Sequence, residues 1–351
     1  MTKEEFIEYS KNQIVCDCVS LSNYLYSCII TRQHPGYYAT LLLYLNLFIV
    51  ESEKFCKDNK LSFGDIKNLD LKKFLNKFRS KSNKLYIDMT IDSLKSIEEF
   101  NESEYEKFSK HHKNSIICNY NIFLVNQYPI CNYHLLCKKI LGFNVGVHSD
   151  FSDKLENHMF NLLSYIFDKN FLCKQNLSEI LLPKFDIKVV DINTYVDYIN
   201  FRIKNKSINL AFIDVVCTIN YYKLIFKKIN NDCILDLKIK YITLYNAILS
   251  LDGIVNFCIN NNIVLPYKLD FRNYIIELKN IYVKNLPRKV CMHYNYERAS
   301  NLFKSDPVIE AFETVFNDKI NNITNKLNAV IDELFINLNK YIFLKEIKVI
   351  D

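Results

Sequence analysis

SDPVIEAFETVFNDKINNITNKLNAVIDELFINLNKYIFL, residues 305–344, carries the clearest periodic pattern of the chain. It opens with Ser305-Asp306-Pro307, an N-cap candidate followed by a proline at the first helical position, where no backbone N–H is required. Apolar residues then recur at alternating steps of four and three, with Asn337 as the one break; they are Phe316, Ile320, Ile323, Leu327, Val330, Leu334 and Tyr341. Such steps place side chains on one stripe of a helix. The pattern predicts one long amphipathic helix over about 306–344.

A helix of this length spans roughly 54 Å, so it must lie along a large core or pair with another chain. The interaction residues predicted on its stripe are Phe316, Ile320, Ile323, Leu327, Val330 and Leu334. Residues beside the stripe are mostly asparagine and lack the dense Glu/Lys pairing that selects coiled-coil partners. This favours burial within the chain's own bundle, with a homodimeric coiled coil as the alternative.

Length and composition predict a folded, soluble chain. The 351 residues suffice for one large domain or two ordinary ones, and with 49% hydrophobic and 24% charged residues the chain has the balance of a globular protein. Leu141–Asp150 holds two of the five glycines and is the best candidate boundary. We therefore predict a helical bundle over 1–148 and an α+β domain over 149–351 that ends in the long helix.

Helical periodicity dominates the N-terminal part. Ile14, Cys18, Leu21, Leu25 and Cys28 recur at helical steps, and His34-Pro35-Gly36 ends this helix. A second helix is predicted over about 37–56. Further helices are predicted at about 65–78, 88–100 and 104–113. One more is opened by Pro129, with Ile130, Tyr133, Cys137 and Leu141 on one side, and another is capped by Ser152 and ends before Pro183.

The middle of the chain changes pattern and predicts a small sheet. Short runs rich in β-branched residues occur at Phe185–Asp191, Ile208–Val216 and Cys233–Lys240; the first and third alternate, and the second is apolar nearly throughout. Helical patterns lie at 195–203, 221–228 and 244–258, and Val264–Leu286 fits either structure. The predicted fold class is therefore mainly α (α+β), with a helical bundle, a small middle sheet and a long C-terminal amphipathic helix.

The cysteines and the apolar segments indicate an intracellular protein. No export signal precedes the twelve cysteines, so we expect reduced thiols in the cytoplasm. Gln33–Val50 is uncharged but short for a bilayer and contains proline, glycine and asparagine, which favours a buried helix over a membrane span. Heavy use of Ile, Lys, Asn, Tyr and Phe is typical of AT-rich genomes, such as those of large DNA viruses or parasites. For a viral protein, host cytoplasm or virion is the expected location.

One basic stripe suggests nucleic acid as a partner. Its cations are Lys73, Lys77, Arg79, Lys81 and Lys84, and most are spaced to line one helix face that could follow a phosphate backbone. The next stretch, 88–106, is mainly acidic. Two adjacent helices of opposite charge would neutralise each other, so mutual pairing is favoured and a nucleic-acid surface is the alternative.

Cys131-x-x-His134-x-x-Cys137 is the one spacing typical of a metal site. On a helix the three side chains would share one arc. A structural zinc site requires four ligands, and Cys137 also fits the apolar side of its predicted helix, so buried core residues are favoured over a metal.

Asp214 and the pair Asp236-x-Lys238 are the candidate catalytic residues. An acid on one strand, followed by a strand that carries Asp-x-Lys, is the minimal pattern of metal-dependent nucleases of the restriction-enzyme type, where the acids hold magnesium. The alternative is ordinary polar residues on the solvent face of alternating strands.

Several common catalytic motifs are missing from the sequence. It has no G-x-x-x-x-G-K-[ST], G-x-G-x-x-G, H-E-x-x-H or G-x-S-x-G motif, and we recognise no family in it. The leading interpretation is a non-enzymatic intracellular interaction or scaffold protein without cofactor, which assembles through the C-terminal helix with a protein partner or itself. The alternatives are a basic nucleic-acid-binding factor of viral replication or transcription and a metal-dependent nuclease.

Overall fold

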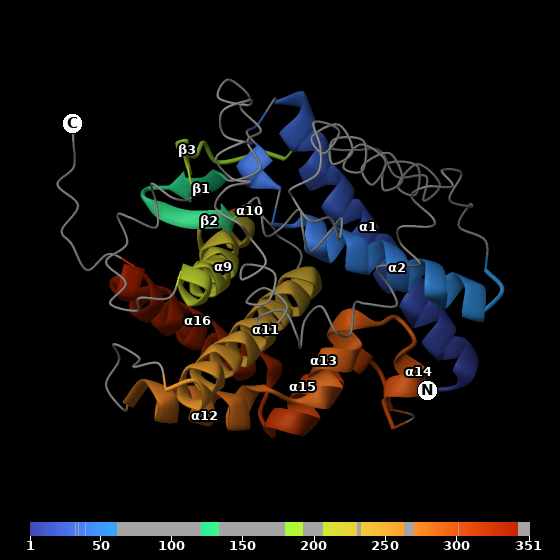
Figure 1. Cartoon of the computed structure of the whole chain (residues 1–351). Helices are drawn as coiled ribbons and strands as arrows, with labels where there is room; N and C mark the ends of the chain where they lie inside the picture. The colour runs from blue at the N-terminus through green and yellow to red at the C-terminus, as the bar shows by residue number, and fades with distance from the viewer. Residues whose placement is uncertain are drawn as a thin grey trace.

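The structure is a computed structural model. It describes residues 1–61 except 32, 34 and 39, and residues 121–132, 180–191, 206–229, 233–262, 270–300 and 302–342. Within these residues the fold is mainly α, with one small antiparallel sheet (Figure 1). The predicted fold class is thereby confirmed.

The first two helices follow the sequence prediction. α1 spans Lys3–Ile30, a 3-10 turn, η1, spans Pro35–Tyr37, and α2 spans Leu42–Asp58. Every member of the predicted α1 stripe is buried, namely Ile14, Cys18, Leu21, Leu25 and Cys28. The helices predicted at 65–78, 88–100, 104–113 and 195–203 lie outside the described residues. So does the helix that Ser152 caps as far as residue 179, and residues 180–182 are not helical.

The sheet has the strand order β2-β1-β3. Its strands are β1 (Asn121–Val125), β2 (Tyr128–Asn132) and β3 (Ile187–Asp191), and both pairings are antiparallel. Asn126 and Gln127, with φ angles of 48° and 70°, join β1 to β2. Positive φ at both turn residues gives the twist that a two-residue hairpin favours. β3 confirms the last part of the strand predicted over Phe185–Asp191.

The predicted helix does not begin at Pro129, and its remainder, from Tyr133 to Leu141, lies outside the described residues. Pro129 lies in β2, an edge strand, where the missing backbone N–H is tolerated. Ile130 and Cys131 are buried in this strand. Two of the three strands thus fall within 1–148, the part for which the sequence predicts a helical bundle.

The strand predicted over Ile208–Val216 is also wrong. These residues belong to α9 (Lys206–Tyr221), which continues through a π-helical turn, η3 (Tyr222–Phe226), into α10 (Lys227–Ile229). Several α9 residues lie fully in the core, among them Phe212, Ile213, Val215, Val216 and Ile219. A helix buried on most sides has no polar stripe, so its sequence resembles a buried strand. The helical pattern predicted at 221–228 is confirmed.

The alternating segment Cys233–Lys240 is helical as well, and it begins α11 (Cys233–Asn260). The alternation suggested polar residues facing solvent, yet Lys238 and Lys240 are buried and each forms an ion pair with a carboxylate. The helix predicted over 244–258 is the remainder of α11. Among the described helices, α11 alone is long and apolar enough to cross a membrane, and 67% of its most apolar window is buried inside the protein.

Three shorter helices follow α11; the first two contact α11, and the third contacts α1 and the second. They are α12 (Asp270–Tyr282), α13 (Asn285–Met292) and α14 (Tyr296–Ala299). α12 shows that most of the ambiguous stretch Val264–Leu286 is helical. α11 lies at the centre of the molecule, where α9, α12, α13 and α16 contact it (Figure 1).

The long C-terminal helix is two helices. α15 spans Pro307–Phe316 and α16 spans Ile320–Ile342. Asp306 caps α15 by accepting the backbone N–H of Ile309 at 2.9 Å, with Pro307 next to it, which confirms the predicted start. The break occurs at Asn317, which adopts the left-handed conformation (φ 48°) that asparagine tolerates better than most residues. The apolar spacing continues across this break, which is why the sequence predicts one helix.

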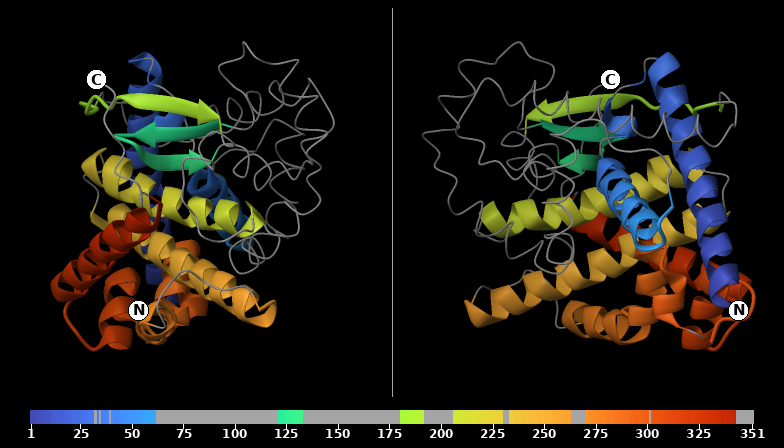
Figure 2. Two further views of the ribbon diagram at one scale, coloured as in Figure 1. Left: turned by 60° about the vertical axis from the view of Figure 1, so that its left-hand side comes forward. Right: turned by 90° about the vertical axis from the view of Figure 1, so that its right-hand side faces the viewer.

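The stripe of α16 faces the chain's own core. Ile323, Leu327, Val330 and Leu334 are buried, while Phe316 and Ile320 pack against the core at its margin. α16 contacts α9, α15 and α11. The two views of Figure 2 show it crossing beneath α9, on the side away from the sheet. Burial within the chain is therefore the arrangement observed for the stripe.

Side chains from both ends of the described chain share one hydrophobic core. Phe6 and Tyr24 of α1, Phe48 of α2, Ile248 of α11 and Leu338 of α16 belong to the same cluster. The division into 1–148 and 149–351 stays a prediction.

Candidate functional site

The predicted catalytic residues do not lie on strands. Asp214 is in α9, and Asp236 and Lys238 are in α11. Asp236 and Lys238, two positions apart on a helix, point in different directions. Asp236 binds the hydroxyl of Tyr222 at 2.8 Å and the ammonium of Lys240 at 2.9 Å. The strand pattern on which the nuclease hypothesis depends is therefore absent from these residues.

The helical geometry assumed for the Cys131, His134 and Cys137 metal site is contradicted at its first residue. Cys131 is a buried residue of strand β2. His134 and Cys137 lie outside the described residues. No group of three or more His, Cys, Asp or Glu side chains that could hold a metal ion occurs in the described part of the chain.

The basic stripe is not described by the structure. Its residues, Lys73, Lys77, Arg79, Lys81 and Lys84, all fall within 62–120. The nucleic-acid hypothesis on this stripe stays a prediction.

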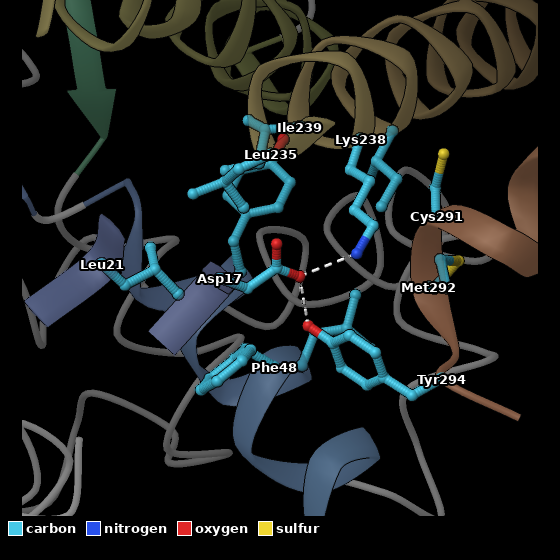
Figure 3. A pocket seen from close by; sticks show the side chains of 12 residues that line it. Asp17, Leu21, Phe48, Leu235, Lys238, Ile239, Cys291, Met292 and Tyr294 are labelled. Carbon is cyan, nitrogen blue, oxygen red and sulfur yellow. Dashed lines mark hydrogen bonds and ion pairs between the residues drawn. The ribbon is translucent and has the colours of Figure 1, made fainter. Parts of the chain in front are cut away.

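The strongest concentration of buried charge lies where α1, α11 and the segment after α13 meet. Lys238 donates to Asp17 Oδ2 at 2.7 Å, and the Tyr294 hydroxyl donates to the same oxygen at 2.5 Å. Gln13 Nε2 donates to the other carboxylate oxygen, Oδ1, at 2.8 Å. Figure 3 shows Lys238 and Tyr294 converging on Asp17 from different elements. We call these four residues the Asp17 cluster.

The Asp17 cluster is almost completely shielded from water. Asp17 is 1% exposed and Lys238 is 3% exposed. The Lys238 ammonium also lies 4.8 Å from the ring centroid of Tyr294, within range of a cation–π interaction. Burial, and then the negative charge of Asp17, raise the pKa of Tyr294, so this hydroxyl keeps its proton and acts as a donor.

The sequence carries signals for the Asp17 cluster at the level of single positions. Asp17 lies between Ile14 and Leu21 on the apolar stripe of α1, where a charge needs a buried partner. Lys238 lies between Leu237 and Ile239, in a segment where charged and apolar residues alternate. Each position is recognisable alone, but the sequence does not show which cation meets which carboxylate, because the two residues are 221 positions apart.

A small cavity adjoins the Asp17 cluster. Its volume is about 40 Å³, and Leu21, Phe48, Ile239, Cys291 and Met292 contribute to its wall (Figure 3). Ligand pockets typically measure about 300–1,000 Å³, and a cavity of this size admits only a few water molecules. Burial raises the pKa of the Cys291 thiol, although the nearby Lys238 charge opposes the shift. A protonated thiol is a poor nucleophile.

Two further polar contacts join distant elements. His293 Nδ1 lies 2.7 Å from Glu51 Oε2, which connects the end of α13 to α2. Asn220 of α9 and Asn339 of α16 exchange two side-chain hydrogen bonds, of 3.0 and 2.7 Å, and Asn220 also donates to the Pro129 carbonyl. Each contact positions one element against another.

No family model, curated protein or solved structure matches the chain.

The geometry of the Asp17 cluster favours a structural role over a chemical one. Both carboxylate oxygens of Asp17 accept hydrogen bonds from the chain itself, and the ammonium of Lys238 is bound to Asp17. A general base needs a free lone pair within reach of a substrate. The arrangement instead links α1 to α11 and to the segment that carries Tyr294.

Proposed function

We propose that the protein is a non-enzymatic interaction or scaffold protein that self-associates. The observation that carries this proposal is the state of the Asp17 cluster, which is the best candidate for a reactive site among the described residues. Its ionisable groups bind one another, and the adjoining cavity of about 40 Å³ holds no substrate larger than a few waters.

The assembly surface differs from the one that the sequence predicts. Ile323, Leu327, Val330 and Leu334 are in contact with the chain's own core, so a second chain cannot reach them in the folded protein. Association through the C-terminal helices would have to use the outward side of α16, where Ile336 is 51% exposed. Any other contacts with a second chain would have to involve residues that do not belong to the stripe.

Sedimentation velocity over about 1–300 µM tests the proposal. Interfaces below about 1,000 Å² are weak and transient, so the range has to extend to high concentration. We expect the sedimentation coefficient to rise with concentration while the melting temperature of the fold changes little. A chain that stays monomeric over the whole range would contradict self-association.

Nucleic-acid binding is the second candidate, and the basic sequence of residues 67–84 favours it. An electrophoretic shift assay with single- and double-stranded oligonucleotides over a salt series separates the two functions. A protein that follows phosphates loses affinity steeply as salt rises. A Lys77→Glu, Lys81→Glu variant, compared with a Lys289→Glu control on α13, would then bind less tightly. No binding at low salt would exclude this candidate.

A further inference from the structure

β3 is an edge strand with one side free of any described strand. It pairs with β1 on one side, and the sheet order β2-β1-β3 places no described strand on the other. Figures 1 and 2 show β3 on the outer side of the sheet, farthest from α9. An edge of this kind presents backbone N–H and C=O groups that a further strand can bind.

The sequence leading into β3 is complementary to itself when reversed. It reads Phe185-Asp186-Ile187-Lys188-Val189, with apolar residues alternating with one acid and one base. The alternation matches the structure, because Asp186 and Lys188 are exposed while Phe185 and Ile187 are half-buried. Val189 is 39% exposed. Neither Asp186 nor Lys188 forms an ion pair with a described residue.

An antiparallel pair of two such segments, related by a two-fold axis through Ile187, satisfies all five positions. Ile187 lies opposite Ile187 of the second copy, and Val189 lies opposite Phe185. On the other face Lys188 lies opposite Asp186, and symmetry creates this pair twice. Opposite charges directly across an antiparallel pair stabilise it, and like charges destabilise it. A two-fold interface of this kind is closed, so it forms dimers and not fibres.

We propose that β3 and the residues before it form the self-association surface, pairing antiparallel with β3 of a second copy in the register centred on Ile187. The proposal rests on the self-association proposed above and names its surface. Charge complementarity selects a second copy as the occupant. An isolated lysine would protect an edge strand from self-pairing, whereas a lysine two positions from an aspartate makes the strand its own partner.

Charge reversal at two exposed positions tests this register. Asp186→Lys places lysine opposite Lys188 of the other copy, and Lys188→Asp places aspartate opposite Asp186. Each change replaces two attractive pairs by two repulsive ones, so we expect dimerisation to weaken by about tenfold to a hundredfold. The double variant Asp186→Lys, Lys188→Asp restores both pairs and should dimerise like the wild type. Lys289→Asp, at an exposed lysine of α13, is the control.

Mixing the two single variants gives a sharper result. In the mixed pair, both lysines of one chain face both aspartates of the other, so heterodimers should form at concentrations where neither variant alone dimerises appreciably. Sedimentation velocity with one variant fluorescently labelled measures this directly. Circular dichroism and thermal melting show that each variant remains folded.

The outcomes separate this surface from the general proposal. Wild-type association that the single reversals leave unchanged would overturn the β3 surface and leave self-association standing. A wild type that stays monomeric at all concentrations would overturn both. Weakened single variants without recovery in the double variant or in the mixture would show that the register is wrong.

Discussion

The apolar stripe of α16 and the Asp17 cluster are both buried in the same core, but they are stabilised by different physics. The stripe contributes apolar side chains such as Leu327 and Leu334, whose burial removes area from water and has no directional requirement. The Asp17 cluster contributes a carboxylate, an ammonium and a hydroxyl that depend on each other's positions. Apolar substitutions that keep the side-chain volume should therefore be tolerated in the first region, and partner loss should be costly in the second.

The two regions also differ in how strictly they fix the alignment of the helices that they join. Apolar contacts between helices allow sliding and repacking, because hydrophobic side chains of similar volume substitute for one another. The Lys238–Asp17 bond forms only when α1 and α11 are in one alignment. We infer that the Asp17 cluster fixes this alignment, and that the stripe supplies more of the stability.

The largest effect is expected when a charge enters the stripe. Leu327 is 0% exposed, so Leu327→Lys removes apolar contacts and buries an unpaired ammonium. We expect a loss of more than about 4 kcal/mol in the free energy of unfolding, a large share of the total stability of an ordinary domain. Urea denaturation measures it, with Ile336→Lys on the exposed side of α16 as the control. Because the stripe is internal, the loss should be the same at every protein concentration, unlike that of a coiled-coil dimer.

Separating the Asp17–Lys238 pair should cost nearly as much. Lys238→Met keeps the bulk of the side chain but leaves Asp17 buried without its cation, which typically costs about 3–5 kcal/mol. Asp17→Leu combined with Lys238→Met removes both charges and should recover most of that loss. Urea denaturation of the wild type, both single variants and the double variant forms a complete cycle. Additive losses in the double variant would show that the two charges are not coupled.

The buried pair of neutral polar side chains, Asn220 of α9 and Asn339 of α16, should give the next largest effect. Asn339→Ala leaves Asn220 with one fewer partner in the core, and we expect a cost of about 1–3 kcal/mol. Asn325→Ala, at an exposed asparagine of the same helix, should change stability by less than about 0.5 kcal/mol. Equal losses at the two positions would mean that the paired hydrogen bonds contribute nothing beyond helix propensity.

The sequence predicts the regions that rest on apolar periodicity and misses those that rest on partners. The α1 stripe, the Asp306 cap and the apolar face of α16 were predictable because each depends on residues within a few turns of one another. The break at Asn317 was not predicted, since the apolar spacing passes through it unchanged. Asn317-Asp318 is a recognisable helix stop followed by a cap, but only once the periodic signal is set aside.

The two segments wrongly predicted as strands fail for opposite reasons. Ile208–Val216 has no polar side because α9 is surrounded by protein, and an apolar run does not distinguish helix from strand. In Cys233–Lys240 charged and apolar residues alternate, which is typical of a strand with one face in solvent. Here, however, Lys238 and Lys240 are buried in ion pairs on a helix. The Asp17 cluster was not predicted, because its members lie on different elements and no local pattern connects them.

The smallest effect is expected at the start of α16, where the side chain of Asp318 lies at the surface and is 22% exposed. Asp318 accepts hydrogen bonds from the Lys319 backbone N–H, the Asn322 amide and the Lys326 ammonium, at 2.8, 2.9 and 2.8 Å. The bonds with Lys326 and Asn322 are the main causes that lower the pKa of Asp318 to about 2. Water surrounds this site, so solvent screening keeps its contribution to stability low.

The pH dependence at Asp318 completes the contrast with the buried Asp17. A carboxylate whose pKa is lower in the folded state stabilises the fold above its unfolded pKa, near 3.9, and loses this contribution as the pH falls toward 2. Asp318→Asn should therefore lower the melting temperature by no more than about 2 °C at pH 7, and the difference from the wild type should shrink below about pH 4 and be mostly lost at pH 2. Added salt at pH 7 should reduce the same difference, because exposed charges are screened. Thermal melts of both proteins between pH 2 and 7, at low and high salt, measure this. A difference as large at pH 2 as at pH 7 would mean that the charge of Asp318 does not contribute to it.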